Sequence, residues 1–266
     1  MVEIALIDSI RYYLINQIYA WKSFFAYRTQ SLLWLFYSAF TGIFSFITMT
    51  VIYNVSSGFP GWSYYQMLIL SSIVGMVIAA IGYNVNSGGL IRSMRQGMLD
   101  MHMVKPYGLV TIMISISQSG ALSIISSFAS NLAIFAYAVL MLHLSLAYII
   151  TFLGVVAIGT YALIMFWLML TVLSYHLFKS GMFMYGLINT LSVVGSYPLS
   201  IYGTIIMLLF SIIVPIGIAV YYPAELLLDK INVVFSIAII LFSLVLAFVS
   251  YKLFYMLMRH YTSGGG

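Results

Sequence analysis

The sequence contains no cysteine and very little charge. The absence of cysteine from all 266 residues excludes a disulfide framework and thiol chemistry. Charged side chains make up 6% of the chain, whereas soluble domains carry about 25% because their surfaces face water. Such a small number of charges cannot solvate a surface of this size. The outer surface of the protein is therefore expected to face lipid.

The sequence also lacks the motifs of common catalytic and nucleotide-binding sites. It contains no G-x-x-x-x-G-K-[ST] loop, which excludes ATP binding in the P-loop manner. It contains no H-E-x-x-H motif, no G-x-S-x-G motif and no paired histidines at metal-ligand spacing. We therefore expect no catalytic residues, no metal site and no cofactor on this chain.

Long apolar runs make up most of the sequence, and 64% of the residues are hydrophobic. A helix crosses a bilayer with about 20 apolar residues, whereas barrels show short alternating segments. The runs here are long and continuous, so we predict an all-α polytopic membrane protein with six transmembrane helices. The predicted spans cover residues 31–53, 65–83, 107–142, 146–173, 204–221 and 233–257. The third run is longer than one crossing requires, and we expect its first turns to project from the membrane.

The ends of the chain differ from this transmembrane domain, which we place at residues 31–258. In residues 1–30, apolar side chains recur at helical spacing and charged ones lie largely off that stripe. This pattern predicts an amphipathic interfacial helix, and it is equally compatible with a helix packed on the protein's own base. Residues 259–266 form a tail or linker.

The distribution of basic residues predicts the orientation. With six spans and the N-terminus inside, nine of the ten Lys and Arg residues lie on the inner side, and only Lys230 lies outside. This bias follows the positive-inside rule and explains the net charge of +5 without a nucleic-acid partner. We therefore predict a multi-pass protein of the cytoplasmic (plasma) membrane, in contact with lipid, with both termini cytoplasmic.

Polar residues recur every fourth position in the third apolar run. The repeat comprises Ser115, Ser119, Ser123, Ser127 and Asn131, and Gln118 lies beside it. Small residues at this spacing allow helices to pack closely, and the same face is also a candidate polar wall of a substrate path. No Asp or Glu lies near a span centre, which argues against a proton- or sodium-coupled carrier.

Residues 88–106 form the most distinctive stretch, GGLIRSMRQGMLDMHMVKP. Apolar residues recur there at helical spacing between basic ones, which indicates either an ordinary positive inner loop or a docking helix for a cytoplasmic partner. From Arg95 to Pro106 the stretch resembles the R-x-G-x-L-D-x-x-L-x-[KR]-P signature of type 2 ABC transporter permeases, which have the type V exporter fold. Met103 stands where the family often has leucine. Tyr197-Pro198, Pro215 and Tyr222-Pro223 follow the order of further proline elements in that family.

The resemblance implies specific partners and roles. Such permeases form homo- or heterodimers and bind a pair of cytoplasmic ATP-binding subunits, which carry ATP and Mg. Residues 88–106 would contain the coupling helix between spans two and three, and short re-entrant or external elements would gate the exit between spans five and six. The implied coupling residues are Arg92, Arg95, Gly97, Leu99, Asp100, Lys105 and Pro106, and the implied exit residues are Tyr222, Pro223 and Glu225. Family substrates include drugs, peptides, lipids and glycan-lipids.

Three alternatives remain at this stage. A membrane channel or assembly subunit would have no ATPase partner. An integral membrane enzyme would need Asp, Glu or His clustered at one membrane face, and no such cluster is visible. A secondary carrier usually shows broken helices at matching positions of two repeats, and Pro215 has no counterpart in the first half.

Overall fold

The computed structural model describes residues 2–56, 58–117 and 121–263, and its regular elements within those ranges are helices. They are α1 (Val2–Ala26), α2 (Arg28–Val55), α3 (Tyr64–Asn84), α4 (Ser87–Arg95), α5 (Met98–Met103), α6 (Leu109–Ile116), α7 (Ala121–Met141), α8 (Leu146–Phe178), α9 (Met182–Gly195), α10 (Thr204–Leu208), α11 (Ile216–Ala219), α12 (Tyr221–Leu227) and α13 (Val233–Met258). A 3₁₀ turn, η1 (Leu199–Tyr202), precedes α10, and a π-helical turn, η2 (Leu209–Ile213), follows it.

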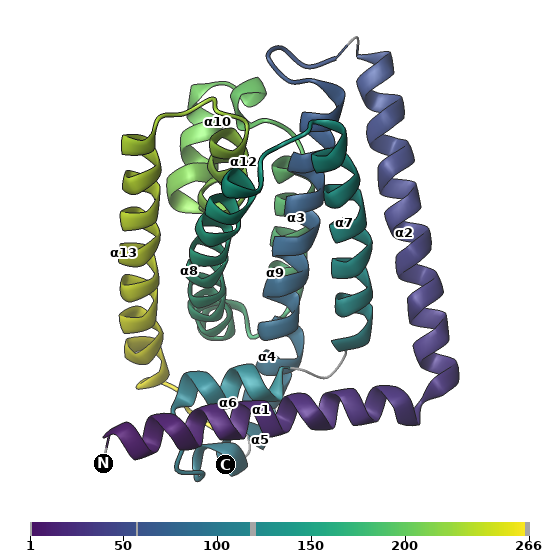
Figure 1. Ribbon diagram of the computed structural model, residues 1–266. Helices are drawn as coiled ribbons and strands as arrows, with labels where there is room; N and C mark the ends of the chain where they lie inside the picture. Colours follow the sequence, from purple (N-terminus) through teal and green to yellow (C-terminus); the bar gives the residue numbers. More distant parts are fainter. Residues whose placement is uncertain (1, 57, 118–120, 264–266) are drawn as a thin grey trace.

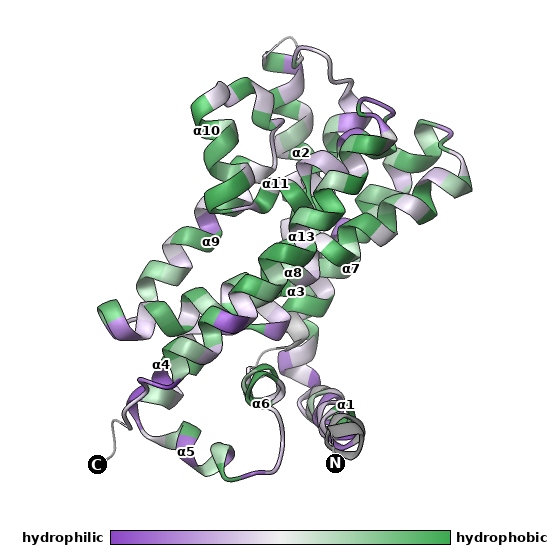
Figure 2. Ribbon diagram, turned by 90° about the vertical axis from the view of Figure 1, so that its left-hand side faces the viewer, coloured by the Kyte–Doolittle hydropathy of each residue, from purple (hydrophilic) through white to green (hydrophobic). Residues whose placement is uncertain are grey.

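Long upright helices form a bundle, and α1 lies across one end of it (Figure 1). The helices α4, α5 and α6 and both chain termini lie at that same end, which we call the α1 end. Figure 2 shows that the upright helices are mainly hydrophobic, whereas α4 and α5 carry many of the hydrophilic residues. Apolar surface therefore covers the middle of the bundle, where lipid would surround it.

Five helices are long and apolar enough to cross a membrane, and a bent helix pair raises the number to six within the described residues. Large apolar side chains such as Phe36 and Phe40 on α2 point outward, as lipid-facing residues do. The predicted class, an all-α polytopic membrane protein, is confirmed.

The third predicted span differs from the prediction, because residues 107–142 do not form one helix. α6 ends at Ile116, α7 begins at Ala121, and α6 packs against α1 at the α1 end of the bundle. The run is longer than a bilayer crossing needs. Its first part forms the separate helix α6, which lies against α1 and does not continue α7.

The fifth predicted span, residues 204–221, also differs. The chain bends by 76° between Thr204–Ile213 and Ile216–Leu227, with Pro215 at the break. Proline has no backbone N–H to donate and its ring clashes with the preceding turn, so a straight helix cannot continue through it. The apolar helix α9, which the sequence analysis did not identify as a helix, packs against α3 and α8.

The core centres on α3, which packs along α7 and also contacts α2, α8 and α9. Glycines allow these close approaches. Gly75 of α3 faces the Asn131 side chain of α7, and a Cβ at Gly42 of α2 would lie 2.7 Å from Ser130 Cβ of α7. Small residues on one helix allow a neighbouring helix to approach closely, so Gly75 leaves room for the Asn131 side chain between α3 and α7.

Side-chain caps mark where several helices begin. Ser63 and Gln66 form a reciprocal capping box at the start of α3, and Asn232 accepts a 2.8 Å hydrogen bond from the Phe235 amide at the start of α13. These caps satisfy backbone N–H groups that the helices themselves leave unpaired.

Candidate functional site

The segment from α4 to α5 turns sharply at Gly97. Gly97 has a φ of +69°, in the left-handed region that glycine enters without steric cost. The turn directs α5 back across the α1 end of the bundle, and Leu99, which is fully buried, fixes it to the core. Gly97 and Leu99 of the predicted coupling set therefore shape the segment, Gly97 through its left-handed turn and Leu99 through its burial.

Asp100 of the same set lies against the C-terminal end of its own chain. The Tyr261 phenol donates a 3.1 Å hydrogen bond to the Met94 carbonyl and interacts with the Asp100 carboxylate. Burial, followed by the proximity of Asp100, raises the pKa of Tyr261 to about 12, so the phenol stays protonated. Tyr175 of α8 donates a 2.9 Å hydrogen bond to the next carbonyl, that of Thr262. We call Met94, Asp100, Tyr175, Tyr261 and Thr262 the C-terminal clasp.

Replacement of Tyr261 by phenylalanine tests this clasp. The buried Met94 carbonyl would lose its side-chain donor, so we expect the free energy of unfolding to fall by about 1 kcal/mol. Thermal unfolding in detergent measures the effect. Tyr161→Phe, at an exposed position on α8, is the matched control and should leave the midpoint unchanged. Equal midpoints for the two variants would contradict the clasp.

Lys105 ties α1 to the other side of the segment. Its Nζ donates a 3.1 Å hydrogen bond to the Tyr12 hydroxyl, and the Tyr12 ring stacks on Tyr107 with centroids 4.3 Å apart. Nζ also lies 3.4 Å from His102 Nδ1. Burial, with a smaller contribution from the Lys105 charge, lowers the pKa of His102. Lys105 therefore holds the N-terminal helix against the segment.

Three apolar side chains point outward between these two ties. Met101 is 65% exposed, Val104 is 84% exposed, and Met103 is also exposed. We call Met101, Met103 and Val104 the apolar tip. The sequence analysis did not select Met101 or Val104, because both occupy variable positions of the signature and only their exposure distinguishes them. Pro106, which the prediction did include, follows the tip and is exposed.

Arg92 and Arg95 line a cavity to which the apolar tip does not contribute. Both are exposed, and the cavity has a volume of about 610 Å³ and lies between α4 and the start of α9. Lys179, at the end of α8, contributes a third positive charge, and the cavity lining contains no Asp or Glu. We call this space the basic cavity.

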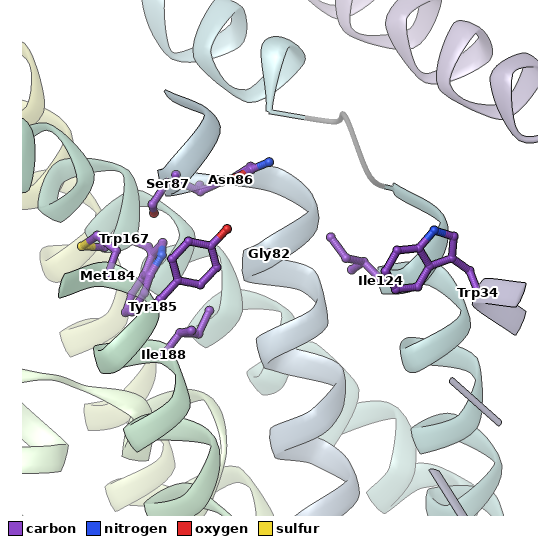
Figure 3. Close-up of a pocket in the computed structure, with 11 residues that line it drawn as sticks. Trp34, Gly82, Asn86, Ser87, Ile124, Trp167, Met184, Tyr185 and Ile188 are labelled. Carbon is purple, nitrogen blue, oxygen red and sulfur yellow. The ribbon is translucent and has the colours of Figure 1, made fainter. Parts of the chain in front are cut away.

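A second cavity, of about 430 Å³, adjoins the basic cavity and shares Tyr185 with it. Figure 3 shows Tyr185 and Ile188 on one side of α3 and Ile124 and Trp34 on the other, with Gly82 between them. Because Gly82 has no side chain, this central cavity extends across the surface of α3. Its lining contains no charged residue.

A third cavity, of about 570 Å³, continues from the central one and shares Trp34, Gly82, Ile124 and Ile188 with it. Its polar lining residues come from four helices and are Tyr37, Thr41, Ser45, Ser71, Ser127, Asn131, Ser192 and Ser196. We call it the hydroxyl cavity. Several of these groups bond to carbonyls of their own helix, as Thr41 does to Ser38 at 2.9 Å and Ser196 to Ser192 at 2.6 Å. Polar groups satisfied in this way cost little within a membrane.

The structure brings together only part of the predicted four-residue repeat. Ser127 and Asn131 line the hydroxyl cavity, whereas Ser115 is buried in α6, on the far side of the helix break. Gln118 and Ser119 lie outside the described residues, as does the side chain of Ser123. The hydroxyl groups of α2, α3 and α9 were missed, because no periodicity within one helix connects them.

The end of the bundle opposite α1 contains the predicted exit residues. The Tyr222 hydroxyl lies 2.8 Å from Ser211 Oγ, and Pro223 is buried beside it in α12. Glu225 is half-buried and attracts Lys230.

Lys230, which the sequence analysis placed outside without a role, connects two loops at this end. Its Nζ lies 3.5 Å from the centroid of the Trp62 ring and donates a 2.6 Å hydrogen bond to the Gly61 carbonyl. Burial lowers the pKa of Lys230, while Glu225 opposes that shift. The loop before α3 and the loop before α13 are thereby held together.

Within the three described stretches of the chain, no group of three His, Asp or Glu side chains comes close enough to hold a metal ion. The searches of curated proteins and of solved structures found no match to the chain. A family model described as "ABC-2 family transporter protein" matches residues 39–265, which is most of the chain. The predicted resemblance is therefore confirmed, and the chain belongs to the ABC-2 family of transporter proteins, the type 2 ABC transporter permeases.

Proposed function

We propose that this chain is the permease subunit of an ATP-driven exporter of hydrophobic or amphipathic substrates in the cytoplasmic membrane. A pair of separate cytoplasmic subunits binds ATP and Mg, and a second permease, identical or related, completes the transporter. The observation that carries this proposal is the exposed apolar tip, which is held between a tie to α1 and the C-terminal clasp. Exposed methionine and valine side chains on a fixed turn are suited to docking in an apolar cleft of a partner.

The connection between the tip and the substrate path is mechanical. α3 and α4 form one nearly continuous apolar unit, Tyr64–Arg95, without a bend above 40°. This unit contributes to all three cavities, from Ser71 in the hydroxyl cavity to Arg95 in the basic cavity. A displacement of the tip by ATP-driven closure of the partner would therefore move the α3 wall of the path.

The arrangement of open and closed ends favours export. The three cavities join one another from the α1 end inward, whereas Lys230 and Trp62 close the loops at the opposite end. A substrate would thus load from the side of the ATP-binding subunits and leave past Tyr222, Pro223 and Glu225. Hydrocarbon parts of a substrate suit the uncharged central cavity, and polar parts suit the hydroxyl cavity.

The absence of cysteine makes single-cysteine labelling a direct test. Met101→Cys should react with a membrane-impermeant maleimide only from the cytoplasmic side, and binding of the ATP-binding subunit should protect it. Pro60→Cys, in the loop before α3, should react only from the outer side and without protection. Labelling of both positions from one side would refute the orientation. Unprotected labelling of Met101→Cys in an assembled complex would refute docking at the tip and favour a channel or assembly subunit.

A further inference from the structure

We propose that the basic cavity binds the acidic head group of the transported substrate, and that the substrate is therefore an anionic amphiphile whose apolar part enters the central cavity. This inference rests on the proposed function and names the substrate class that the path is built to accept. It begins from three positive charges that line one cavity, Arg92, Arg95 and Lys179.

Among the described residues, no acidic side chain pairs with the charges in the basic cavity. No ion pair or side-chain hydrogen bond links Arg92, Arg95 or Lys179 to any part of the chain that the structure describes. Asp100, on the same segment, is engaged by Tyr261 on the other side. Three cations around one cavity repel one another unless an anion joins them, and guanidinium groups bind carboxylates and phosphates through charge-assisted hydrogen bonds.

The backbone at Lys179 supports a role for its side chain. Lys179 ends α8 with a φ of +49°, in the left-handed region where helices ordinarily place glycine. A lysine there accepts a conformational cost that glycine would avoid. The turn that follows is tight, since a Cβ at Gly181 would lie 2.9 Å from the Gly88 Cα. Lys179, which is exposed, thereby lines the basic cavity next to this turn.

The basic cavity is charged and the adjoining central cavity is not. This difference indicates a ligand with a charged head group and an apolar tail. Tyr185 lines both cavities and packs on Gly88, with its ring 3.1 Å from a Cβ built there. Beyond Tyr185 the lining is uncharged and includes the indole rings of Trp34 and Trp167. A charged group would lose its hydration there without compensation. A head group retained by Arg92 and Arg95 with a tail beyond Tyr185 satisfies both environments.

The test uses 11-(dansylamino)undecanoate and its uncharged methyl ester with the full chain in phosphatidylcholine nanodiscs. Energy transfer from the tryptophans to the dansyl group reports binding, and nanodiscs without protein give the background. We expect the carboxylate to bind about tenfold more tightly than the ester. The triple variant Arg92→Gln, Arg95→Gln, Lys179→Gln should bind both probes equally, with its affinity for the ester unchanged.

A second triple variant, Arg11→Gln, Lys252→Gln, Arg259→Gln, removes the same charge from exposed positions outside the basic cavity and should keep the preference. Loss of the preference in both triple variants would show a general effect of net charge and overturn the inference. Inorganic phosphate alone should compete weakly, because it cannot occupy the central cavity. Competition by phosphate as strong as that by undecanoate would overturn the amphiphilic part of the proposal.

Lys179→Gly separates binding from folding. Glycine relieves the left-handed conformation, so the variant should unfold at the same or a higher temperature while its preference for the carboxylate decreases. An unchanged preference would remove Lys179 from the site. If the first triple variant kept the preference but no longer bound the ATP-binding subunit, the arginines would serve docking. That result would overturn this inference and leave the proposed function standing.

Discussion

Replacement of Met101 and Val104 by aspartate is expected to abolish binding of the ATP-binding subunit. Both side chains belong to the apolar tip. Because they are exposed, neither packs in the core of the protein. Docking would have to bury two carboxylates in an apolar cleft, which costs far more than the lost contacts alone. We expect the affinity to fall by roughly 100-fold or more. Co-purification and ATP hydrolysis by the reconstituted complex measure the effect.

Thr262→Asp provides the control for added charge at the same end of the molecule. Thr262 is exposed and contributes only its backbone carbonyl to the C-terminal clasp. This variant should assemble as the wild type does. Normal assembly of the double aspartate variant, with a normal unfolding temperature, would exclude the tip as the docking surface.

Replacement of Gly82 by leucine should stop transport without preventing assembly. Gly82 lies where the central cavity crosses α3, and a Cβ there would meet only the Ile124 Cδ1 atom at 3.7 Å. The Cβ of a leucine at this position is therefore accommodated, and we expect the rest of its side chain to fill the central cavity. Because the obstruction lies in the cavity and not at the tip, we expect loss of substrate-stimulated ATP hydrolysis with basal hydrolysis retained. Hydrolysis with and without added undecanoate probe measures the difference.

Gly154→Leu is the matched control for this variant. Gly154 lies on α8, is exposed, and has nothing within 4 Å of a Cβ built on it, so a leucine there would point into lipid. It should leave both basal and stimulated hydrolysis unchanged. Stimulation by the probe in the Gly82 variant as strong as in the wild type would mean that the substrate follows another route.

The candidate site illustrates how far a sequence motif can be interpreted. The signature from Arg95 to Pro106 located the segment and led to the family. The motif gave no indication of which way each side chain points. In the folded chain, Leu99 enters the core, Asp100 meets Tyr261, and Lys105 meets Tyr12. Met101 and Val104, at positions that the motif leaves variable, are exposed in the folded chain. A signature records residue identity, whereas exposure depends on neighbours from both chain termini.

The hydroxyl cavity, which we propose as part of the substrate path, was even less accessible to sequence analysis. Its polar wall combines hydroxyl groups of α2, α3, α7 and α9, and each helix contributes only a few of them. The repeat within residues 107–142 suggested a single continuous face, but the break between α6 and α7 removes Ser115 from it. Gly82 leaves space for the central cavity because it has no side chain. A pattern of side chains in the sequence does not reveal such a space.

The sequence by itself determined that this chain lies in a membrane, that it is helical, and to which family it belongs. Lipid imposes these properties segment by segment, because every apolar run must satisfy its own backbone hydrogen bonds. Only the tertiary structure decided where the chain bends at Pro215, which charges of the described residues gather in the basic cavity, and which side chains of residues 88–106 are exposed. These properties depend on contacts between residues far apart in the chain, and such contacts exist only after the helices have packed.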